Sequence, residues 1–181
     1  MKVIGIIGSK IAGKETAAKY IAANYHGKQL AHSDILFEIL SILHVEARRD
    51  NVIHLSALRE KFGEDVLINA VNKKISEIDA PLVVVTGIRF KNELENIRAY
   101  PDSKIIYINS PIELRYQRQL HRASRVDDKN MTFDEFIALE KRNTEEGIAE
   151  LGKSADYVID NSGSLQDFHA ALDLTMKEIL K

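Results

Sequence analysis

The sequence predicts a three-layer α/β/α fold, in which helices cover both faces of a five-stranded parallel sheet. Five short apolar runs alternate with segments of helix length along the 181 residues. Three of these runs are continuously apolar, which is typical of strands that are covered on both faces. The intervening segments carry apolar residues three and four positions apart, as amphipathic helices do. Strands that alternate with helices in this way favour a parallel sheet.

The sequence indicates where the five strands lie and where two of the later helices begin, because residues typical of helix N-caps precede those helices. Ser164 is a good N-cap for the final helix. Thr132 is expected to cap a helix that begins near Phe133, with Glu135 at the capping-box position. The strands are expected at residues 3–7, 29–31, 82–86, 105–108 and 157–159.

Two regions depart from the simple alternation of strands and helices. Residues 33–79 contain two or three consecutive helices with no strand between them. Residues 121–131 form a short, polar and charge-dense connection. We interpret the first region as a helical insert and the second as a mobile flap, both within a single domain that spans residues 1–181.

The composition excludes several classes of protein. The net charge of −2 gives no overall attraction to nucleic acid or to an anionic membrane. The absence of cysteine excludes disulfides and cysteine-ligated metals, and the scattered histidines show no ligand pairing. No apolar run approaches the ~18 residues of a membrane span, and the apolar N-terminus is too short for a signal peptide. We therefore expect a cytoplasmic protein without a membrane or nucleic-acid partner, and the oligomeric state stays open.

A phosphate-binding loop is predicted between the first strand and the first helix. The spacing G-x-x-x-x-G-K lets consecutive backbone N–H groups point inward at a phosphate, and the glycines permit the tight turn. The positive end of the following helix adds to this attraction, and the lysine reaches the terminal phosphates. The loop residues expected to hold the nucleotide are Gly8, Ser9, Lys10, Ile11, Ala12, Gly13, Lys14, Glu15 and Thr16.

Glu15 stands where the usual loop has serine or threonine, and a carboxylate should repel an anion. Adjacent helical positions diverge by about 100°, so Glu15 can point to solvent while Thr16 faces the phosphates. We therefore expect Thr16 to be the residue on the magnesium side.

With these loop residues the chain resembles the nucleoside monophosphate kinase branch of P-loop proteins, which includes adenylate kinases, deoxynucleoside monophosphate kinases and dephospho-coenzyme A kinases. The resemblance implies a P-loop nucleotide kinase fold, with ATP and Mg²⁺ as cofactors.

The third strand ends in a second motif of this group. Gly87, Arg89 and the pair Asn92 and Glu93 match the resembled pattern, but Thr86 replaces the aspartate that would hold a magnesium-bound water. A threonine can bind a water but cannot supply the charge. Arg89 lies at the carboxyl end of a parallel strand, where ligands collect, so we expect it to face the acceptor phosphate.

Several arginines cluster between residues 115 and 125. For Arg115 we prefer a solvated basic stripe. Arg118, Arg122 and Arg125 resemble lid arginines, which close over the triphosphate and stabilise the phosphoryl group in transfer. By the same resemblance residues 121–131 are the lid, and the R-x-D-D motif begins at Arg125. Arg142 is either a further phosphate ligand or a member of a surface ion pair with a nearby glutamate.

The insert and the last strand supply the remaining candidate residues. By the resemblance the insert at 33–79 binds the acceptor, and Ser33 and Asp34 begin that region. The arginine that the resemblance leads us to expect at position 37 is a phenylalanine, so Arg48 and Arg49 could serve instead. Asp34 is equally well explained as a carboxylate in the first turn of a helix. Asn161 follows the last strand, and the resemblance places it near the adenine.

These observations leave three functional hypotheses. The leading one is an ATP-dependent phosphotransferase whose acceptor is a small phosphate-bearing molecule, preferably a nucleoside or deoxynucleoside monophosphate. Dephospho-coenzyme A is the alternative acceptor, and its hydroxyl would need a base, for which Asp34 is the candidate. A nucleotide-binding module or sensor that has lost catalysis is the third, motivated by Thr86 and Phe37. A GTPase switch is disfavoured because no N-K-x-D motif occurs.

Overall fold

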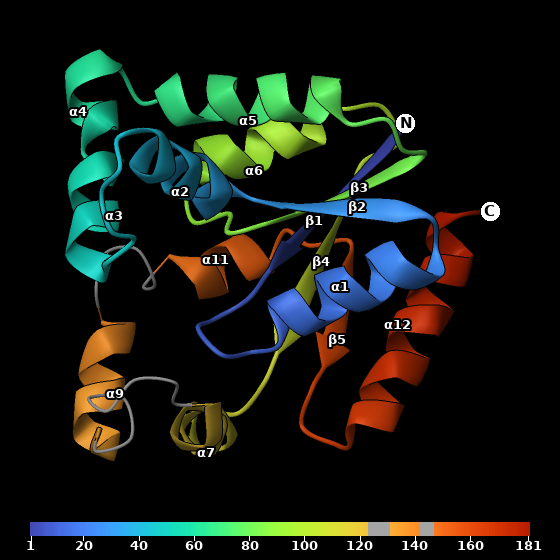
Figure 1. Cartoon of the computed structure of the whole chain (residues 1–181). Coiled ribbons are helices and arrows are strands. Elements are labelled where there is room, and N and C mark those ends of the chain that lie inside the picture. The colour runs from blue at the N-terminus through green and yellow to red at the C-terminus, as the bar shows by residue number, and fades with distance from the viewer. Residues whose placement is uncertain (123–130, 142–146) are drawn as a thin grey trace.

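A five-stranded parallel sheet forms the centre of the molecule (Figure 1). The computed structural model describes residues 1–122, 131–141 and 147–181, except for the side chains of Arg49, Arg122 and Leu139. The strands lie in the order β2-β3-β1-β4-β5, with every neighbouring pair parallel. Their bounds are β1 (Lys2–Ile7), β2 (Gly27–Ala31), β3 (Leu82–Thr86), β4 (Lys104–Asn109) and β5 (Tyr157–Asp160). The predicted parallel sheet is therefore confirmed, and each expected strand differs from the observed one by at most two residues at an end.

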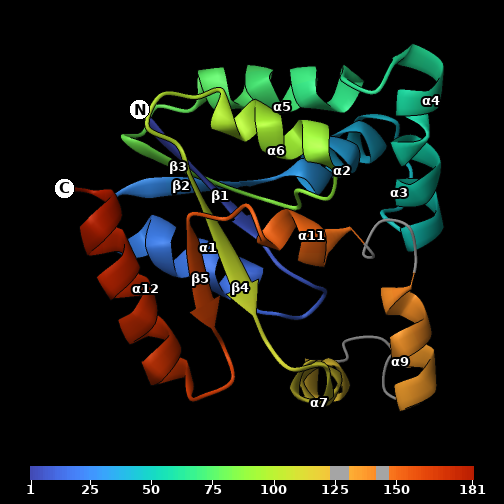
Figure 2. The ribbon, with the colours of Figure 1, turned by 180° about the vertical axis from the view of Figure 1, so that it is seen from behind.

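Helices cover both faces of this sheet. On one face, α1 (Lys14–Asn24) and α12 (Leu165–Ile179) pack against β1, β3 and β4 through a core that contains Ile21, Phe168 and Leu172. On the other face, α5 (Val66–Glu77) and α6 (Lys91–Arg98) close a second core around Val71 and Ile97. The two pairs of helices lie on opposite sides of the sheet in both views (Figures 1 and 2). The three layers that the sequence predicts are confirmed.

The predicted helix caps are also present. Ser164 Oγ accepts a hydrogen bond from the N–H of Asp167 at 3.1 Å, and Oδ2 of Asp167 accepts one from the N–H of Ser164 at 3.2 Å. At the start of α9 (Phe133–Glu140), Thr132 Oγ1 accepts from the N–H of Glu135 at 3.2 Å, and the Glu135 carboxylate accepts from the Thr132 N–H at 2.7 Å. Each pair satisfies backbone donors that a helix N-terminus leaves without an intrahelical partner.

Four helices, rather than the two or three expected, lie between β2 and β3. They are α2 (His32–Ile42), α3 (Arg49–Ser56), α4 (Leu58–Phe62) and α5. The division into α3 and α4 escaped sequence reasoning because both helices are short, and α4 buries no residue that would mark a periodic apolar face. Gly63, with φ of 98°, ends α4 in a conformation that a side chain rarely adopts.

Three further helices complete the described part of the chain. They are α7 (Ile112–Arg122), α9 and α11 (Ile148–Gly152). Most of the predicted lid, including Arg125, lies outside the described residues, as does Arg142. Arg122 ends α7, but its side chain is not among those described. Among the helices that the structure describes, none has the length and the apolar character needed to cross a membrane.

Candidate active site

The loop between β1 and α1 requires glycine at both ends of its motif. Gly8 has φ of 151°, and a Cβ added there would lie 2.5 Å from the main-chain oxygen of Ile108. Gly13 has φ of 109°, and its Cβ would lie 2.4 Å from Nδ2 of Asn161. Both positions combine a left-handed backbone with a neighbour too close for a side chain. The loop is therefore pressed against the ends of β4 and β5.

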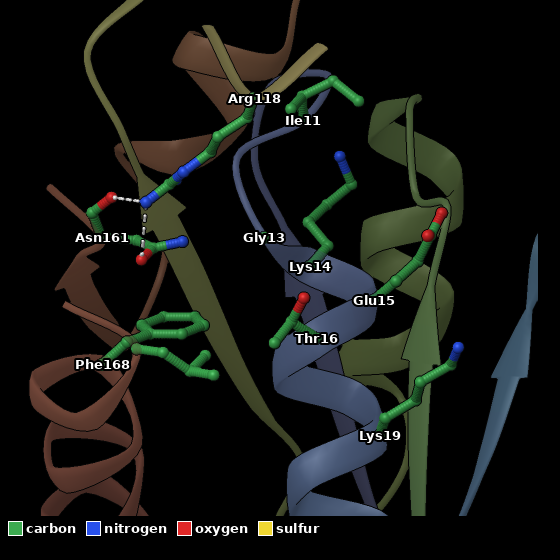
Figure 3. A pocket seen from close by; sticks show the side chains of 10 residues that line it. Ile11, Gly13, Lys14, Glu15, Thr16, Lys19, Arg118, Asn161 and Phe168 are labelled. Atoms are coloured by element: carbon green, nitrogen blue, oxygen red, sulfur yellow. Dashed lines mark hydrogen bonds between the residues drawn. The ribbon is translucent and has the colours of Figure 1, made fainter. Parts of the chain in front are cut away.

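Lys14 begins α1 and folds back over this loop. Its Nζ donates hydrogen bonds to the main-chain oxygens of Gly8 at 2.7 Å and Ser9 at 2.8 Å. In Figure 3 its ammonium group points toward Ile11, at the tip of the loop. The loop is closed by a further backbone bond, from the N–H of Ala12 to the oxygen of Ser9. The lysine thus carries its positive charge to the concave side of the loop, where a phosphate would be bound.

A cavity of about 590 Å³ opens above the loop and the first turn of α1. This volume falls within the range of about 300–1,000 Å³ that is usual for small-molecule sites. Phe168 supplies an apolar wall, and Lys14 and Arg118 supply positive charge (Figure 3). The residues that line the cavity are Ile11, Gly13, Lys14, Glu15, Thr16, Lys19, Arg118, Asn161, Leu165 and Phe168.

Arg118 and Asn161 form the wall opposite α1. Arg118 Nη2 donates to the main-chain oxygen of Asn161 at 2.9 Å and approaches its Oδ1 at 3.3 Å, while Nη1 donates to Ser110 Oγ at 3.1 Å. Burial lowers the pKa of Arg118 from its ordinary value, but an arginine side chain stays protonated and positively charged at neutral pH. Nδ2 of Asn161 in turn donates to the oxygen of Ala12 at 2.8 Å. The asparagine side chain therefore joins the loop to the arginine.

We expect Asn161→Ala to weaken ATP binding and to lower the free energy of unfolding by about 1–3 kcal/mol, because the Ala12 oxygen and the Arg118 guanidinium each lose a partner. Isothermal titration with ATP and urea unfolding measure the two effects. Asn72→Ala is the matched control, since Asn72 exchanges amide hydrogen bonds with Asn96 beside the opposite face of the sheet. A loss of ATP affinity in the control as large as in Asn161→Ala would contradict the prediction that Asn161 belongs to the nucleotide site.

Arg115 differs from its predicted role as a solvated arginine. Only 6% of the residue is exposed, and Nη1 lies 2.7 Å from Oε2 of Glu140 in α9. Nη1 also donates to the main-chain oxygen of Lys10, and Nε donates to that of Ser110, both at 3.1 Å. The predicted basic stripe is therefore wrong at this position, because the helix turns Arg115 inward. Arg115 connects the phosphate-binding loop to both helices that flank the predicted lid.

A second cavity, of about 200 Å³, adjoins the first at the carboxyl ends of β2 and β3. Ser33 and Asp34, which were predicted to bind the acceptor, both line it, and so does Thr86. Oδ2 of Asp34 also accepts from the N–H of Ala31 at 2.7 Å, so this carboxylate is a helix cap as well. The remaining lining residues are Glu15, Lys19, Gln29, Leu30, Ala31 and Phe37.

Glu15 and Thr16 occupy different sides of the first turn of α1. Both side chains are exposed, and both line the larger cavity. Figure 3 shows Thr16 on the side of Asn161 and Phe168 and Glu15 on the opposite side. Glu15 alone of the two also lines the smaller cavity, together with Thr86. The two cavities therefore meet at Glu15 and at Lys19, which follows it by one helical turn.

Two predicted acceptor residues are not among those lining either cavity. Arg48 is exposed, and its Nε lies 2.6 Å from Oε2 of Glu46. Arg89 is exposed on the segment that follows β3, and its N–H donates to Oε2 of Glu93 at 2.7 Å. Glu93 is itself buried and holds this segment in place. The backbone of Arg89 is therefore anchored close to the carboxyl end of β3.

Sequence reasoning assigned no site role to Phe168 and Leu165, which form the apolar wall of the larger cavity, nor to Lys19 and Arg115. Lys19 lines both cavities, and the signal that could have found it is its spacing of four residues from Glu15, which puts both on one helical face. Arg115 gave no such signal, because a buried and an exposed arginine look alike in an amphipathic helix. Its role depends on contacts with Lys10 and Glu140 that are distant in the sequence.

The donors near the loop suit a hard cation that is bound mainly by phosphates. Glu15, Thr16 and Thr86 offer oxygen atoms only, and magnesium prefers oxygen ligands at near-octahedral geometry. Among the residues that the structure describes, no group of three or more histidine, cysteine, aspartate or glutamate side chains could hold a metal. A cation bound here would therefore need the nucleotide phosphates and water as its other ligands.

Sequence comparison finds relatives along the whole chain. The chain is 30% identical over 186 residues to a UPF0200 protein of Methanococcus maripaludis, and this alignment covers 99% of this chain and 98% of that protein. It is 29% identical over 185 residues to a UPF0200 protein of Saccharolobus solfataricus, covering 100% of this chain and 95% of the relative. A UPF0200/UPF0201 protein of Archaeoglobus fulgidus is 32% identical over 173 residues, and the chain spans 53% of its length. No protein-family model matches the chain.

Structural comparison finds solved kinases with the same fold. A shikimate kinase of Bacteroides thetaiotaomicron superimposes with a TM-score of 0.69 at 18% identity, covering 99% of this chain and 98% of that one. A dephospho-CoA kinase of Campylobacter jejuni gives a TM-score of 0.57 at 19% identity, covering 99% and 98%. A gluconokinase of Sinorhizobium meliloti gives 0.58 at 14% identity, covering 99% and 95%. At such low identity these likenesses show the fold, which is that of P-loop kinases.

Proposed function

The chain belongs to the UPF0200 family, and from its fold and its site we propose that it is an ATP-dependent phosphotransferase. The acceptor would be a small phosphate-bearing molecule, with a nucleoside or deoxynucleoside monophosphate as the preferred class. The observation that carries the proposal is the pair of adjoining cavities that meet at the first turn of α1. Phosphoryl transfer needs two substrates to bind side by side with their reacting oxygens in line.

The larger cavity fits the nucleotide. The loop that begins at Gly8 would hold the β- and γ-phosphates on its N–H groups, and Lys14 would exchange its bonds to the Gly8 and Ser9 oxygens for bonds to the phosphates. Phe168 and Leu165 would provide the apolar wall for the base, on the side of Asn161. Magnesium, held on the side of Thr16, would neutralise charge between the β- and γ-phosphates.

Arginine side chains would stabilise the phosphoryl group as it moves. Arg118 already faces the larger cavity, where its two hydrogen bonds to Asn161 hold the guanidinium in a fixed orientation. A preorganised cation costs no reorganisation at the moment of transfer, which is why such groups accelerate the reaction. We propose that Arg122 and Arg125 join it from the lid, and that Arg89 meets the acceptor phosphate.

An assay that couples ADP formation to NADH oxidation tests this proposal. Nucleoside and deoxynucleoside monophosphates and dephospho-coenzyme A are offered in turn, with ATP and magnesium. Turnover of one acceptor class well above the ATPase background is the expected result. Tight ATP binding without turnover of any acceptor would instead favour the third hypothesis, a nucleotide-binding module or sensor, for which Thr86 is the supporting observation.

Asp34→Asn is expected to distinguish the two acceptor classes. Asp34 lines the smaller cavity, so its carboxylate can receive the proton of an acceptor hydroxyl, as dephospho-coenzyme A would require. A monophosphate acceptor is already anionic and needs no base. We expect kcat to fall about 100-fold or more for a hydroxyl acceptor, but less than about fivefold for a monophosphate, for which only the cap to Ala31 is weakened.

Circular dichroism of Asp34→Asn controls for the loss of the helix cap. Asp34→Ser keeps an oxygen at the cap but cannot accept a proton at neutral pH, and it should follow the asparagine variant with each acceptor. A strong loss of activity with a monophosphate acceptor in both variants would contradict this division of roles.

A further inference from the structure

The end of β3 has a hydroxyl where the site calls for a carboxylate. Thr86 is 6% exposed and lines the smaller cavity at the carboxyl end of the strand. A threonine oxygen can bind a metal-bound water, but it carries no charge to attract the cation. Magnesium in phosphate-transferring sites is usually held by one or two carboxylates in addition to the phosphates. A carboxylate must therefore come from another part of the cavity wall.

Among the residues that the structure describes, two with a carboxylate line the smaller cavity, Glu15 and Asp34. The Asp34 carboxylate is held by the N–H of Ala31 at 2.7 Å and belongs to the start of α2. Glu15 lines the larger cavity as well, and it stands directly after Lys14 in the first turn of α1. Of the two, Glu15 is therefore the one that adjoins the phosphate-binding loop.

We propose that Glu15 holds the magnesium-bound water that an aspartate at position 86 would otherwise hold. The inference rests on the proposed function, because it assumes that ATP binds with magnesium at this loop. Glu15 and Thr86 line one cavity, so the cation site keeps a carboxylate although its place in the sequence has moved from β3 to α1. Thr16 lines the larger cavity from the other side of the same turn, so a cation above this turn would have the Thr16 hydroxyl on one side and the charge of Glu15 on the other.

The position of Glu15 explains how the loop tolerates a negative charge. The N-terminus of a helix carries a partial positive charge, which stabilises a carboxylate in the first turn. The same carboxylate repels the triphosphate when no cation is present, and a bound cation converts this repulsion into attraction. Glu15 would thus make nucleotide binding depend on magnesium more strongly than an uncharged residue would.

The test is the ratio of the Kd for ATP measured in EDTA to the Kd measured with saturating magnesium. Glu15→Gln keeps the size of the side chain and removes its charge. We expect the variant to bind metal-free ATP about threefold to tenfold more tightly and magnesium-ATP more weakly, so that the ratio falls at least tenfold. Electron paramagnetic resonance with Mn²⁺ in the presence of ADP should show a matching loss of metal affinity.

Two further variants complete the experiment. Glu178→Gln, on the exposed end of α12, removes one charge far from the loop and should leave the ratio unchanged. Thr86→Asp in the Glu15→Gln background should restore the ratio, since the carboxylate then returns to the strand. Circular dichroism verifies that the double variant folds.

The outcomes separate this inference from the proposed function. If the unaltered protein binds no ATP with magnesium, the proposed function fails. If it binds, but Glu15→Gln lowers the Kd for ATP equally with and without magnesium, the carboxylate only repels the nucleotide and the assignment of Glu15 is wrong. If the variant changes neither Kd, Glu15 lies too far from the nucleotide and the assignment is wrong as well. If the folded double variant keeps the low ratio, Glu15 does not stand in for position 86.

Discussion

Replacing Glu93 by glutamine is expected to lower the free energy of unfolding by about 3 kcal/mol at pH 7, because a buried charge pair loses one partner. Glu93 is 2% exposed, and its Oε1 lies 3.0 Å from Nη2 of Arg59 in the insert. Oε2 accepts the N–H groups of Arg89 at 2.7 Å and Phe90 at 3.2 Å. A glutamine amide has only one accepting oxygen, so either the Arg59 guanidinium or the two backbone N–H groups lose their partner and face the NH2 group instead.

The contribution of Glu93 to the free energy of unfolding should decrease at low pH, because its contacts stabilise the charged carboxylate. Burial alone would raise the pKa of Glu93, but the nearby His32 ring, the Arg89 N–H and the Arg59 guanidinium outweigh it and lower the pKa to about 2. The folded-state pKa thus lies below that of the unfolded chain, near 4.5. The stabilisation is fully present above the unfolded value and is lost as the pH falls from about 4.5 to about 2.

Urea unfolding of both proteins between pH 7 and pH 3 measures this difference. The gap in unfolding free energy should narrow below pH 4.5, because the unaltered protein loses stability that the variant never had. Glu95→Gln is the matched control on the same helix, since the Glu95 side chain is 63% exposed and pairs only at 3.6 Å with Lys91. A gap that stays constant across this pH range would show that Glu93 is not the group that titrates.

The contacts of Glu93 also show why the sequence could predict the fold better than the site. The sheet and its helices follow from runs such as Leu82–Thr86 and from apolar spacing, which are local patterns. Position 93 matched a motif, but nothing local indicated that it would join Arg59 of the insert to the segment that carries Arg89. Such a contact links residues 34 positions apart and depends on how the insert packs.

The same distinction holds within the candidate site. The tight turn between β1 and α1 could be predicted because its conformation depends on glycines that are visible in the sequence. Arg115 could not be assigned correctly, since its burial depends on contacts with Lys10 and Glu140 from two other elements. For Glu15, the sequence showed only an unexpected carboxylate, and it took the two cavities to show that Glu15 and Thr86 line the same one.

Lys14→Met is expected to lower kcat about 100- to 1,000-fold, by analogy with the cost of removing one preorganised donor that stabilises charge in a transition state. Lys14 carries its ammonium over the loop through bonds to the Gly8 and Ser9 oxygens. Methionine fills a similar volume but brings neither the charge nor these bonds. The Kd for magnesium-ATP should rise as well, but by less than kcat falls, because negative charge develops on the leaving oxygen between the β- and γ-phosphates in the transition state.

Steady-state kinetics with the acceptor identified in the coupled assay measure this loss, and Lys28→Met is the control. Lys28 lies exposed on β2 and lines neither of the two cavities, so its replacement should leave kcat and Kd within about twofold. Lys14→Arg separates charge from shape, because the planar guanidinium keeps the charge but cannot enter the curl of the loop as a compact ammonium does. We expect the arginine variant to retain more ATP affinity than the methionine variant while its kcat stays low. If Lys14→Met instead kept kcat within about fivefold, the ammonium would not act on the transferred group, and the phosphotransferase proposal would lose its main electrostatic support.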